Sequence, residues 1–469
     1  MKVAFCSSEV VPFANTGGLG DVCGALPLAL EKLGIEVIIL MPHYRDVKKF
    51  SGSLKKIDEK ISTVTIGKNV QVYFIKNDTF FDREGMYGNK VGDYPDNLER
   101  FEFFCSKSLE LLKKLKLQVD IVHCHDWQTC LIPAYLKFLY GEDPFLKNVK
   151  SVLTIHNMAY QGVFAKEGFS KLKLDKKVFT SEGFEFYDQI NLLKGGIVFS
   201  DMVTTVSETY AREIQTQPLG CGLEGVLLKR KNSVLGILNG LDYDRWNPAS
   251  DSYITKTYSS KNIQDRSLNK IQLQQDLKLP QRLDVPLFGF VGRLSHQKGL
   301  DLLFKVLDKL MKLDVQMVFL GVGEEKYHKL FEGASRKYPE KMVALLEFDE
   351  AMAHRIYAGC DIFLMPSLYE PCGLSQMISL RYGAIPLVHK TGGLADTIVH
   401  FTSKDGRGNG FVFEEFSERA LLEKIQESVN VFHNQKLFLD LVKKALTHDF
   451  SWEKSAREYQ KMYEELVIG

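Results

Sequence analysis

Short apolar runs rich in β-branched residues alternate along the chain with longer segments in which apolar residues recur at helical spacing. This alternation is typical of parallel sheets covered by helices on both faces, so the sequence predicts an α/β fold. The runs end near Gly, Pro, Ser, Asn or polar clusters, as buried strands do. In the first half the predicted strands are Val3–Cys6, Val37–Met41, Asp120–His123, Ser151–Ile155, Met202–Val206 and Val234–Leu238.

The pattern breaks in the middle of the chain and then resumes. Residues from about Asp242 to Pro286 are mostly polar, which indicates a surface excursion or a helical entry into a second domain. We therefore predict two doubly wound domains, 1–241 and 242–450, with ligands in a cleft beyond the carboxyl ends of their strands. The segment 451–469 predicts an amphipathic helix. The second series of predicted strands is Leu287–Val291, Val315–Leu320, Val343–Leu346, Ile362–Met365, Ile385–Val388 and Gly410–Phe413.

Composition narrows the classes of partner. Lys and Arg total 60 against 59 Asp and Glu in 469 residues, so the net charge of +1 gives no general attraction to nucleic acid or anionic membranes. No apolar run approaches the roughly 18 residues that span a bilayer, and the N-terminal segment is typical of a strand and not of a signal peptide. We expect a soluble, cytoplasmic protein with no nucleic-acid or membrane partner.

Two glycine-rich turns share the core Thr-Gly-Gly-Leu, one at 15–22 and one at 390–397. Each follows a predicted strand, and backbone amides at such a turn can hold a phosphate or a sugar oxygen, although a tight βα turn alone would look the same. Lys390 adds a positive charge to the second turn, where the first has Asn15. The dinucleotide pattern GxGxxG fails because its third glycine falls on Cys23, and no phosphate-binding P-loop is present.

Two further strand ends carry charged residues. Arg293 and Lys298 lie five apart after a strand, which suits a departing phosphate, whereas either alone would more often be a solvated surface charge. Glu370 precedes a proline after another strand. Its carboxylate could accept hydrogen bonds from sugar hydroxyls or stabilise positive charge at an anomeric carbon; the alternative is a helix-start carboxylate that interacts with the macrodipole.

Cysteine and histidine patterns give little support for a metal site. Eight cysteines are scattered without a CxxC pair, which predicts reduced thiols, mostly in the core. The segment from His123 to Asp126 ends a strand with HxHD and could hold a metal, but no other Cys or His has a spacing that supplies further ligands. His156, after the next strand, either hydrogen-bonds a substrate hydroxyl or is a structural histidine.

The ordered set of motifs resembles the bacterial glycogen synthase and plant starch synthase family over nearly the whole chain. These proteins are retaining glycosyltransferases with two Rossmann-like domains in the GT-B arrangement, and the resemblance implies that the C-terminal helix crosses back onto the first domain. The segments that carry it are Thr16–Asp21, Phe81–Gly85 with Tyr87, Asn97–Phe101, His125–Trp127, His156–Gly162, Asn239–Pro248, Gly292–Gly299, Glu370–Leu374 and Lys390–Leu394.

The resemblance implies that glucose passes from a nucleoside diphosphate glucose, usually ADP-glucose in bacteria, to the non-reducing 4-hydroxyl of an α-1,4-glucan, elongating glycogen without a metal or other cofactor. Arg293 and Lys298 would stabilise the departing diphosphate, Glu370 would bind the donor sugar and help the cationic transition state, and His156 would contact the sugar through its imidazole or backbone carbonyl. The other implied site residues are Asn15, Gly18, Asp21, Asn239, Phe348 (against the nucleobase), Lys390, Thr391, Gly392 and Gly393 for the donor, and Tyr87 and Asp126 for the acceptor and cleft.

One position departs from the family. Its first glycine turn normally begins with Lys, and here Asn15 stands in that place. We predict weaker donor binding, or a relaxed choice between ADP-glucose and UDP-glucose, because one charge-assisted phosphate contact contributes roughly 1.5–3 kcal/mol, about ten- to a hundredfold in affinity.

Three alternative interpretations fit part of the sequence. They are a related glycosyltransferase acting on a small sugar acceptor, a catalytically weak regulatory paralogue, and a nicotinamide oxidoreductase, which the missing GxGxxG fingerprint disfavours. Retention of configuration without an additional carboxylate in the sequence favours front-face attack, in which the departing phosphate takes the acceptor proton.

Overall fold

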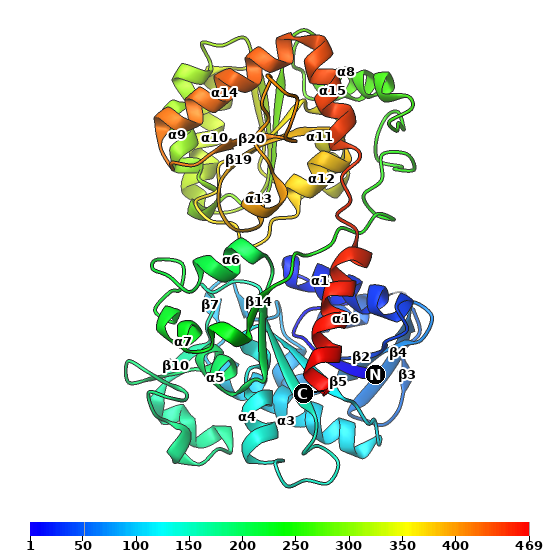
Figure 1. Cartoon of the computed structure of the whole chain (residues 1–469), viewed down its shortest axis with the longest axis vertical. Coiled ribbons are helices and arrows are strands. Elements are labelled where there is room, and N and C mark those ends of the chain that lie inside the picture. Colours follow the sequence, from blue (N-terminus) through cyan, green and yellow to red (C-terminus); the bar gives the residue numbers. More distant parts are fainter. Residues whose placement is uncertain (51, 469) are drawn as a thin grey trace. The chain divides into compact units, whose positions relative to one another are not determined.

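The apolar runs form the strands of two sheets in a computed structural model of the chain, which describes residues 1–50 and 52–468 (Figure 1). The chain divides into two units. The first contains Met1–Gly240 together with the helix α16 (Trp452–Ile468), and the second contains Leu241–Ser451. The α/β class predicted from the sequence is confirmed.

The first unit is built on a sheet with the strand order β14-β13-β9-β8-β1-β2-β5-β4-β3. Strands from β14 to β5 pair in parallel, and β4 and β3 extend this sheet antiparallel. The central strands are buried along almost their whole length, as apolar runs without alternation require. The strands are β1 (Lys2–Cys6), β2 (Glu36–Pro42), β3 (Lys55–Lys56), β4 (Ile61–Ile66), β5 (Val70–Ile75), β8 (Ile121–His125), β9 (Lys150–Ile155), β13 (Met202–Thr205) and β14 (Val234–Gly236).

Short strands outside this sheet were not predicted. They are β6 (Gly88–Asn89) with β7 (Gly92–Asp93), and a small antiparallel sheet of β10 (Val163–Ala165), β12 (Gln189–Asn191) and β11 (Glu185–Phe186). The helices of this unit, besides α16, are α1 (Gly18–Lys32), α2 (Asp78–Phe81), α3 (Asn97–Lys114), α4 (Leu131–Phe138), α5 (Leu192–Phe199), α6 (Glu208–Glu213) and α7 (Glu224–Lys229), with 3-10 turns at Arg45–Lys49, Trp127–Thr129, Lys166–Leu172, Lys176–Val178 and Lys231–Ser233.

The second unit is a parallel sheet with the order β17-β16-β15-β18-β19-β20. Its helices form where apolar residues recur at helical spacing; α9, for example, buries Leu300, Leu303, Leu307 and Leu310 on one side. The strands are β15 (Leu287–Val291), β16 (Gln316–Leu320), β17 (Met342–Leu345), β18 (Ile362–Met365), β19 (Ile385–His389) and β20 (Phe411–Phe413). The helices are α8 (Arg266–Asp276), α9 (Leu300–Leu310), α10 (Glu325–Lys337), α11 (Glu350–Gly359), α12 (Ser375–Arg381), α13 (Gly392–Thr397), α14 (Glu418–His433) and α15 (Gln435–Ala445), with 3-10 turns at Ile263–Asp265 and His296–Lys298.

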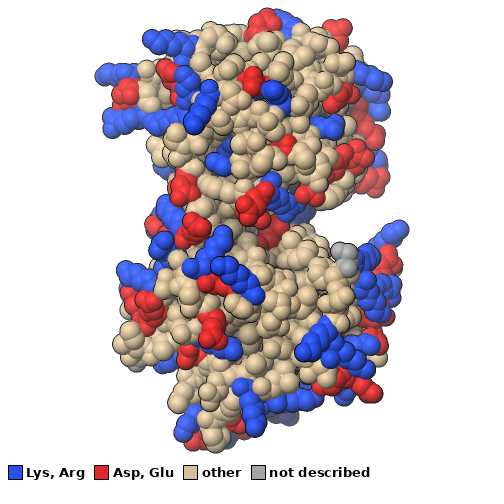
Figure 2. All heavy atoms as spheres, turned by 90° about the vertical axis from the view of Figure 1, so that its right-hand side faces the viewer, with Lys and Arg blue, Asp and Glu red and all other residues tan. Residues whose placement is uncertain are grey.

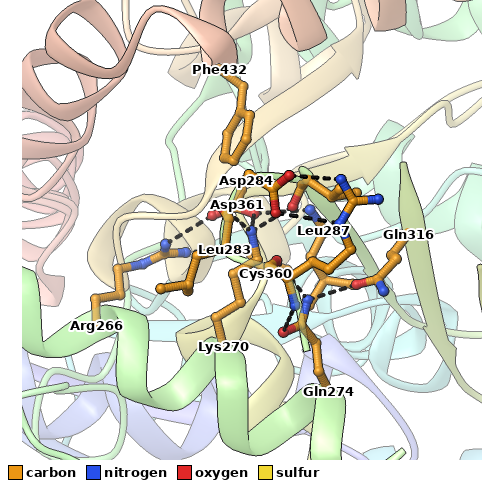
Figure 3. A network of polar contacts seen from close by, with 12 residues as sticks. Arg266, Lys270, Gln274, Leu283, Asp284, Leu287, Gln316, Cys360, Asp361 and Phe432 are labelled. Atoms are coloured by element: carbon orange, nitrogen blue, oxygen red, sulfur yellow. Dashed lines mark hydrogen bonds and ion pairs between the residues drawn. The ribbon is translucent and has the colours of Figure 1, made fainter. Parts of the chain in front are cut away.

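The polar stretch in the middle of the chain enters the second unit through helix α8, which is anchored by a buried charge network (Figure 3). Lys270 donates to Asp361 Oδ2 at 2.7 Å and to the Val285 carbonyl at 2.6 Å. Asp361 Oδ2 also accepts the backbone N–H of Leu287 at 2.9 Å, and Arg266 adds a second cation, 3.6 Å from Asp361. The network therefore joins α8 to the start of β15 and the end of α11, which explains charged residues in a buried position.

Helix α16 packs against α1 in the first unit, as Figure 1 shows. Its Tyr463 hydroxyl lies 2.6 Å from Nδ1 of the buried His123 in β8, and Lys32 of α1 pairs with Glu453 at 3.8 Å. The return of the C-terminal helix to the first domain, implied by the resemblance, is thereby confirmed.

The surface carries both signs of charge side by side on the face shown in Figure 2, in keeping with the near-zero net charge. Within the described residues, no helix has the length and apolar content needed to cross a bilayer. The eight cysteines are free; Cys221 is exposed and the other seven are buried.

Candidate active site

The first glycine turn follows β1 and opens α1. Asn15 Oδ1 accepts the backbone N–H of Gly17 at 2.8 Å, so its amide braces the turn from inside. The buried carboxylate of Glu9 accepts the backbone N–H of Thr16 at 2.6 Å and its hydroxyl at 2.7 Å, and it also accepts the hydroxyl of Tyr87 at 2.7 Å. Glu9 therefore joins this turn to Tyr87, a predicted acceptor residue.

Space around the start of α1 differs from residue to residue. A Cβ at Gly18 would meet nothing within 4 Å, whereas one at Gly20 would lie 2.6 Å from Asn15 Oδ1. Asp21 lies in the first turn of the helix. The open side of the turn is thus the side of Gly18, where backbone amides at a helix start can receive an anion or a hydroxyl oxygen.

Asp126 and His156 follow the neighbouring parallel strands β8 and β9 and meet at their ends. The Asp126 Oδ1 atom accepts the backbone N–H of His156 at 2.7 Å. Asp126 has φ of 54°, in the left-handed region that non-glycine residues rarely adopt. Burial raises the pKa of its carboxyl to about 7, and Glu9 acts in the same direction.

Histidine side chains are packed beneath this pair. His125 Nδ1 lies 3.0 Å from His156 Nε2, and burial lowers the pKa of His156 to about 3. Burial also holds the pKa of His123 and of His125 well below the ordinary value. All three imidazoles are therefore neutral at physiological pH.

Asn239 is the predicted donor residue that follows β14. Its side chain is 6% exposed, and its Oδ1 atom has no hydrogen-bond partner among the described residues. A buried, unpaired amide oxygen is costly and usually has a partner, so this atom is free to accept a hydrogen bond from a ligand hydroxyl.

In the second unit, two predicted catalytic residues are in direct contact. Lys298 Nζ donates to Glu370 Oε2 at 2.6 Å, and the Ser367 hydroxyl donates to the same oxygen at 3.0 Å. Glu370 is 7% exposed. The pair places a fixed cation and a fixed carboxylate at the carboxyl ends of β15 and β18, where ligands of parallel sheets bind.

Arg293 and Phe348 lie on exposed loops near the same edge of the sheet. Arg293 is the second residue after β15, and a Cβ at its neighbour Gly292 would lie 3.9 Å from Lys298 Cε. Phe348 follows β17 and is 84% exposed. An exposed aromatic ring at a strand end is suited to stacking on a planar base.

The second glycine turn packs backbone to backbone against the Glu370 loop. The Gly393 N–H donates to the Glu370 carbonyl at 3.2 Å and to the Pro371 carbonyl at 3.1 Å. A Cβ at Gly392, where φ is +43°, would lie 2.0 Å from the Glu370 carbonyl oxygen, and one at Gly393 would lie 2.0 Å from that of Cys372. Only glycine fits at both positions, and Thr391, before them, is buried.

Lys390 does not point at this contact. Its ammonium donates to Glu414 at 2.6 Å, and both side chains are largely exposed. The predicted phosphate contact therefore requires Lys390 to leave Glu414, a small cost for a solvated surface pair.

The HxHD segment has other partners than a metal. His123 uses both ring nitrogens, one toward Tyr463 and the other, at 2.6 Å, toward the Thr154 hydroxyl. Among the described residues, no group of three or more Cys, His, Asp or Glu side chains has an arrangement that could hold a metal ion.

Two residues of this region were missed by sequence reasoning. Glu9 is a single carboxylate three residues beyond the predicted first strand, and nothing in its spacing connects it to Thr16 or to Tyr87. His125 belongs to a segment that carries the resemblance, but its side chain was given no role beyond that of a possible metal ligand. Its position opposite Thr154 in the parallel register of β8 and β9 is the signal that brings it beside His156.

Known proteins resemble the chain over its full length. Residues 2–229 match the starch synthase catalytic domain, and residues 273–445 match the glycosyl transferases group 1 family. A glycogen synthase of Geotalea uraniireducens is 46% identical over 477 residues, covering 99% of this chain and 98% of the relative. The chain belongs to the glycogen synthase family. A further member, from Thermotoga maritima, is 45% identical over 486 residues, covering 100% of this chain and 99% of the relative. The protein is accordingly a glycosyltransferase.

Solved structures agree with this assignment. The catalytic domain of starch synthase IV from Arabidopsis thaliana, bound to ADP and acarbose, is similar with a TM-score of 0.90 and 32% identity, covering 100% of this chain and 99% of that one. A sucrose-phosphate synthase from Thermosynechococcus elongatus, at 15% identity and a TM-score of 0.62, shares the fold. The predicted GT-B class is therefore confirmed, while the individual site roles stay predictions.

Proposed function

We propose that the protein transfers glucose from ADP-glucose, with retention of configuration, to the non-reducing 4-hydroxyl of an α-1,4-glucan and so elongates glycogen. Support comes from the glycogen synthase relatives and from the structural neighbour bound to ADP and acarbose. The observation that carries the proposal is the Lys298–Glu370 pair, held against a glycine turn whose backbone amides begin a helix.

The donor diphosphate would lie against Arg293 and Lys298. A guanidinium can hold two phosphate oxygens and an ammonium can neutralise a third, so these side chains can supply the charge needed as the diphosphate departs. We propose on this ground that no metal ion or other cofactor is required. The turn of Thr391, Gly392 and Gly393 at the start of α13 would lie beside the phosphates, where the absence of side chains at both glycines lets the backbone come close to them.

Transfer would proceed on one face of the sugar. The bond between the anomeric carbon and the phosphate oxygen breaks with its electron pair on the diphosphate, and the acceptor 4-oxygen forms the new bond from the same side. Its proton passes to the departing phosphate oxygen. Glu370, fixed by Lys298 and Ser367, would stabilise the positive charge that develops on the sugar.

Polar groups of the first unit would contact the sugars. The imidazole or carbonyl of His156 and the unpaired Oδ1 of Asn239 would bind hydroxyls of the transferred glucose. Asp126, held at the His156 backbone, and Tyr87, held at Glu9, would bind on the acceptor side, while Asp21 and Gly18 would line the start of α1.

The proposal is tested by incubating purified protein and EDTA with ADP-glucose or UDP-glucose and maltooligosaccharides. We expect nucleotide release together with chain growth by single glucose units, with the product linkage retaining the α configuration. Nucleotide release without growth would indicate a small acceptor instead, and absence of both signals would favour a regulatory paralogue. A requirement for added metal would contradict the proposed role of Arg293 and Lys298.

Donor choice is tested at Asn15. Its replacement by Lys removes the hydrogen bond to the Gly17 N–H and adds a cation to the turn. Because of the added charge, we expect the donor KM to fall about tenfold and the preference between ADP-glucose and UDP-glucose to change. Asn15→Gln, which alters the brace without adding charge, is the matched control. An unchanged donor KM and unchanged preference in Asn15→Lys would refute the idea.

A further inference from the structure

Two imidazoles lie in contact at the ends of β8 and β9, and only one of them belongs to the proposed machinery. His125 ends β8 directly opposite Thr154, two residues before His156. This register brings His125 Nδ1 to 3.0 Å from His156 Nε2. The arrangement is an N–H···N hydrogen bond, and a bond of this kind between two neutral rings contains a single proton.

The surroundings of His125 determine which ring supplies that proton. His125 Nε2 is buried and has no partner among the described residues. If His156 donated, the remaining proton of His125 would be on Nε2 as a buried, unpaired N–H, which folded proteins rarely contain. If His125 donates from Nδ1, its Nε2 is an unprotonated nitrogen, and no buried N–H is left without an acceptor. The second arrangement avoids the orphaned donor.

The ring of His125 is held in place by its neighbours. It stacks on Phe5 with centroids 5.2 Å apart and lies against His123 at 4.2 Å. His123 is itself fixed by hydrogen bonds to Tyr463 of α16 and to Thr154. The donor nitrogen of His125 therefore keeps one direction.

We propose that His125 is a positioning residue, which donates to His156 Nε2 and thereby keeps the proton of His156 on Nδ1, as a hydrogen-bond donor for the substrate. The inference rests on the proposed function in one respect, since His156 is taken to contact the transferred sugar. Its consequence is that His156 donates to a sugar oxygen and does not accept from a hydroxyl through Nδ1.

The first test reads the tautomer without any substitution. In the ¹⁵N-labelled full-length protein, long-range ¹H–¹⁵N spectra should show His156 protonated at Nδ1 and unprotonated at Nε2, with the signals assigned by their absence in His156→Gln. The opposite tautomer would overturn the proposal. This measurement needs no catalytic activity, so it is independent of whether the proposed reaction occurs.

The second test uses a matched pair of variants. His125→Asn places an amide N–H near the former Nδ1 and should keep the His156 tautomer and at least about a third of kcat. His125→Phe retains a ring but has no donor, and we expect kcat and kcat/KM to fall together by about tenfold or more, as for an interaction that matters in the transition state. His433→Gln, at an exposed histidine of α14, is the control for histidine loss.

Equal rates and an unchanged His156 tautomer in a folded His125→Phe would also overturn the proposal. If that variant does not fold, the spectrum of the unsubstituted protein decides. Absence of glucose transfer by the unsubstituted protein would instead refute the proposed function. The tautomer of His156 would then be decided by the ¹H–¹⁵N spectrum alone.

Discussion

The contact between Lys298 and Glu370 contributes both to stability and to the proposed chemistry. Glu370 is 7% exposed, so removal of its cation leaves a buried carboxylate unpaired. We expect Lys298→Met to lower the free energy of unfolding by about 3 kcal/mol and kcat by about a hundredfold or more. Urea titration and the transfer assay measure the two quantities.

The double variant separates the two contributions. Lys298→Met with Glu370→Gln removes both charges, so most of the lost stability should return while activity stays low. Recovery of activity along with stability would show that the pair has only a structural role.

Asp126 makes stability depend on pH. Its pKa is raised to about 7 by burial, so the folded protein binds the proton more tightly than the unfolded chain. The contribution of protonated Asp126 to the free energy of unfolding is therefore complete below about pH 4 and is lost as pH rises through 7. At pH 8, Asp126→Asn should be more stable than the unsubstituted protein by up to about 4 kcal/mol, with no such gain at pH 4.

Urea titrations at the two pH values measure this difference, with Asp93→Asn at an exposed position of β7 as the control. Asn can still accept the His156 N–H, so the hydrogen bond is kept while the charge is removed. An equal effect of Asp126→Asn at both pH values would contradict the raised pKa.

Sequence patterns identified the site residues that occur in motifs and missed those whose partners are distant in the sequence. Arg293, Lys298 and Glu370 follow strands in recognisable segments, and the structure brings two of them into contact. Glu9 has no motif, because its partners Thr16 and Tyr87 are 7 and 78 residues away. The side-chain direction of Lys390, toward Glu414, also depends on a neighbour that the local sequence does not specify.

At the element scale, the strands of the parallel sheets were predictable because they are buried on both faces and read as continuous apolar runs. The parallel strand β5 and the antiparallel strands β4 and β3 that follow it in the sheet were not predicted. β3 has two exposed lysines, and β4 alternates between buried and more exposed positions, so neither forms such a run. The two- and three-residue strands β6, β7, β10, β11 and β12 are too short for any periodicity to identify them.

The contact between the α13 turn and the Glu370 loop predicts a sharp effect of one methyl group. In Gly393→Ala the new Cβ would lie 2.0 Å from the Cys372 carbonyl oxygen, so both backbones must move. We expect kcat to fall by about tenfold or more, because the α13 turn and Glu370 lose their alignment. The transfer assay with saturating donor measures it.

Gly333 in α10 provides the matched control, since a Cβ there meets nothing within 4 Å. Gly333→Ala should leave activity unchanged and raise the free energy of unfolding by about 0.5–1 kcal/mol through helix propensity. Full activity in Gly393→Ala would show that the close backbone contact does not position the site.

At the scale of the whole molecule, the two units should respond separately to substitutions in α16. Met462 of this helix is 3% exposed within the first unit. Met462→Ala should cost about 2–5 kcal/mol and raise amide hydrogen exchange in β1, β8 and α1, while peptides of the second unit keep their protection. Lys461→Ala, on the exposed side of the same helix, is the control.

The position of α16 also has a consequence for folding during synthesis on the ribosome. The strands that α16 covers are made first, yet the helix itself is translated only after the whole of Leu241–Ser451. At about 5–20 residues per second, this interval lasts on the order of 10–40 s. Throughout this interval the nascent first unit lacks the helix that packs on α1 and contacts His123, so the apolar surface beneath α16 is open to chaperones until the second unit has been synthesised.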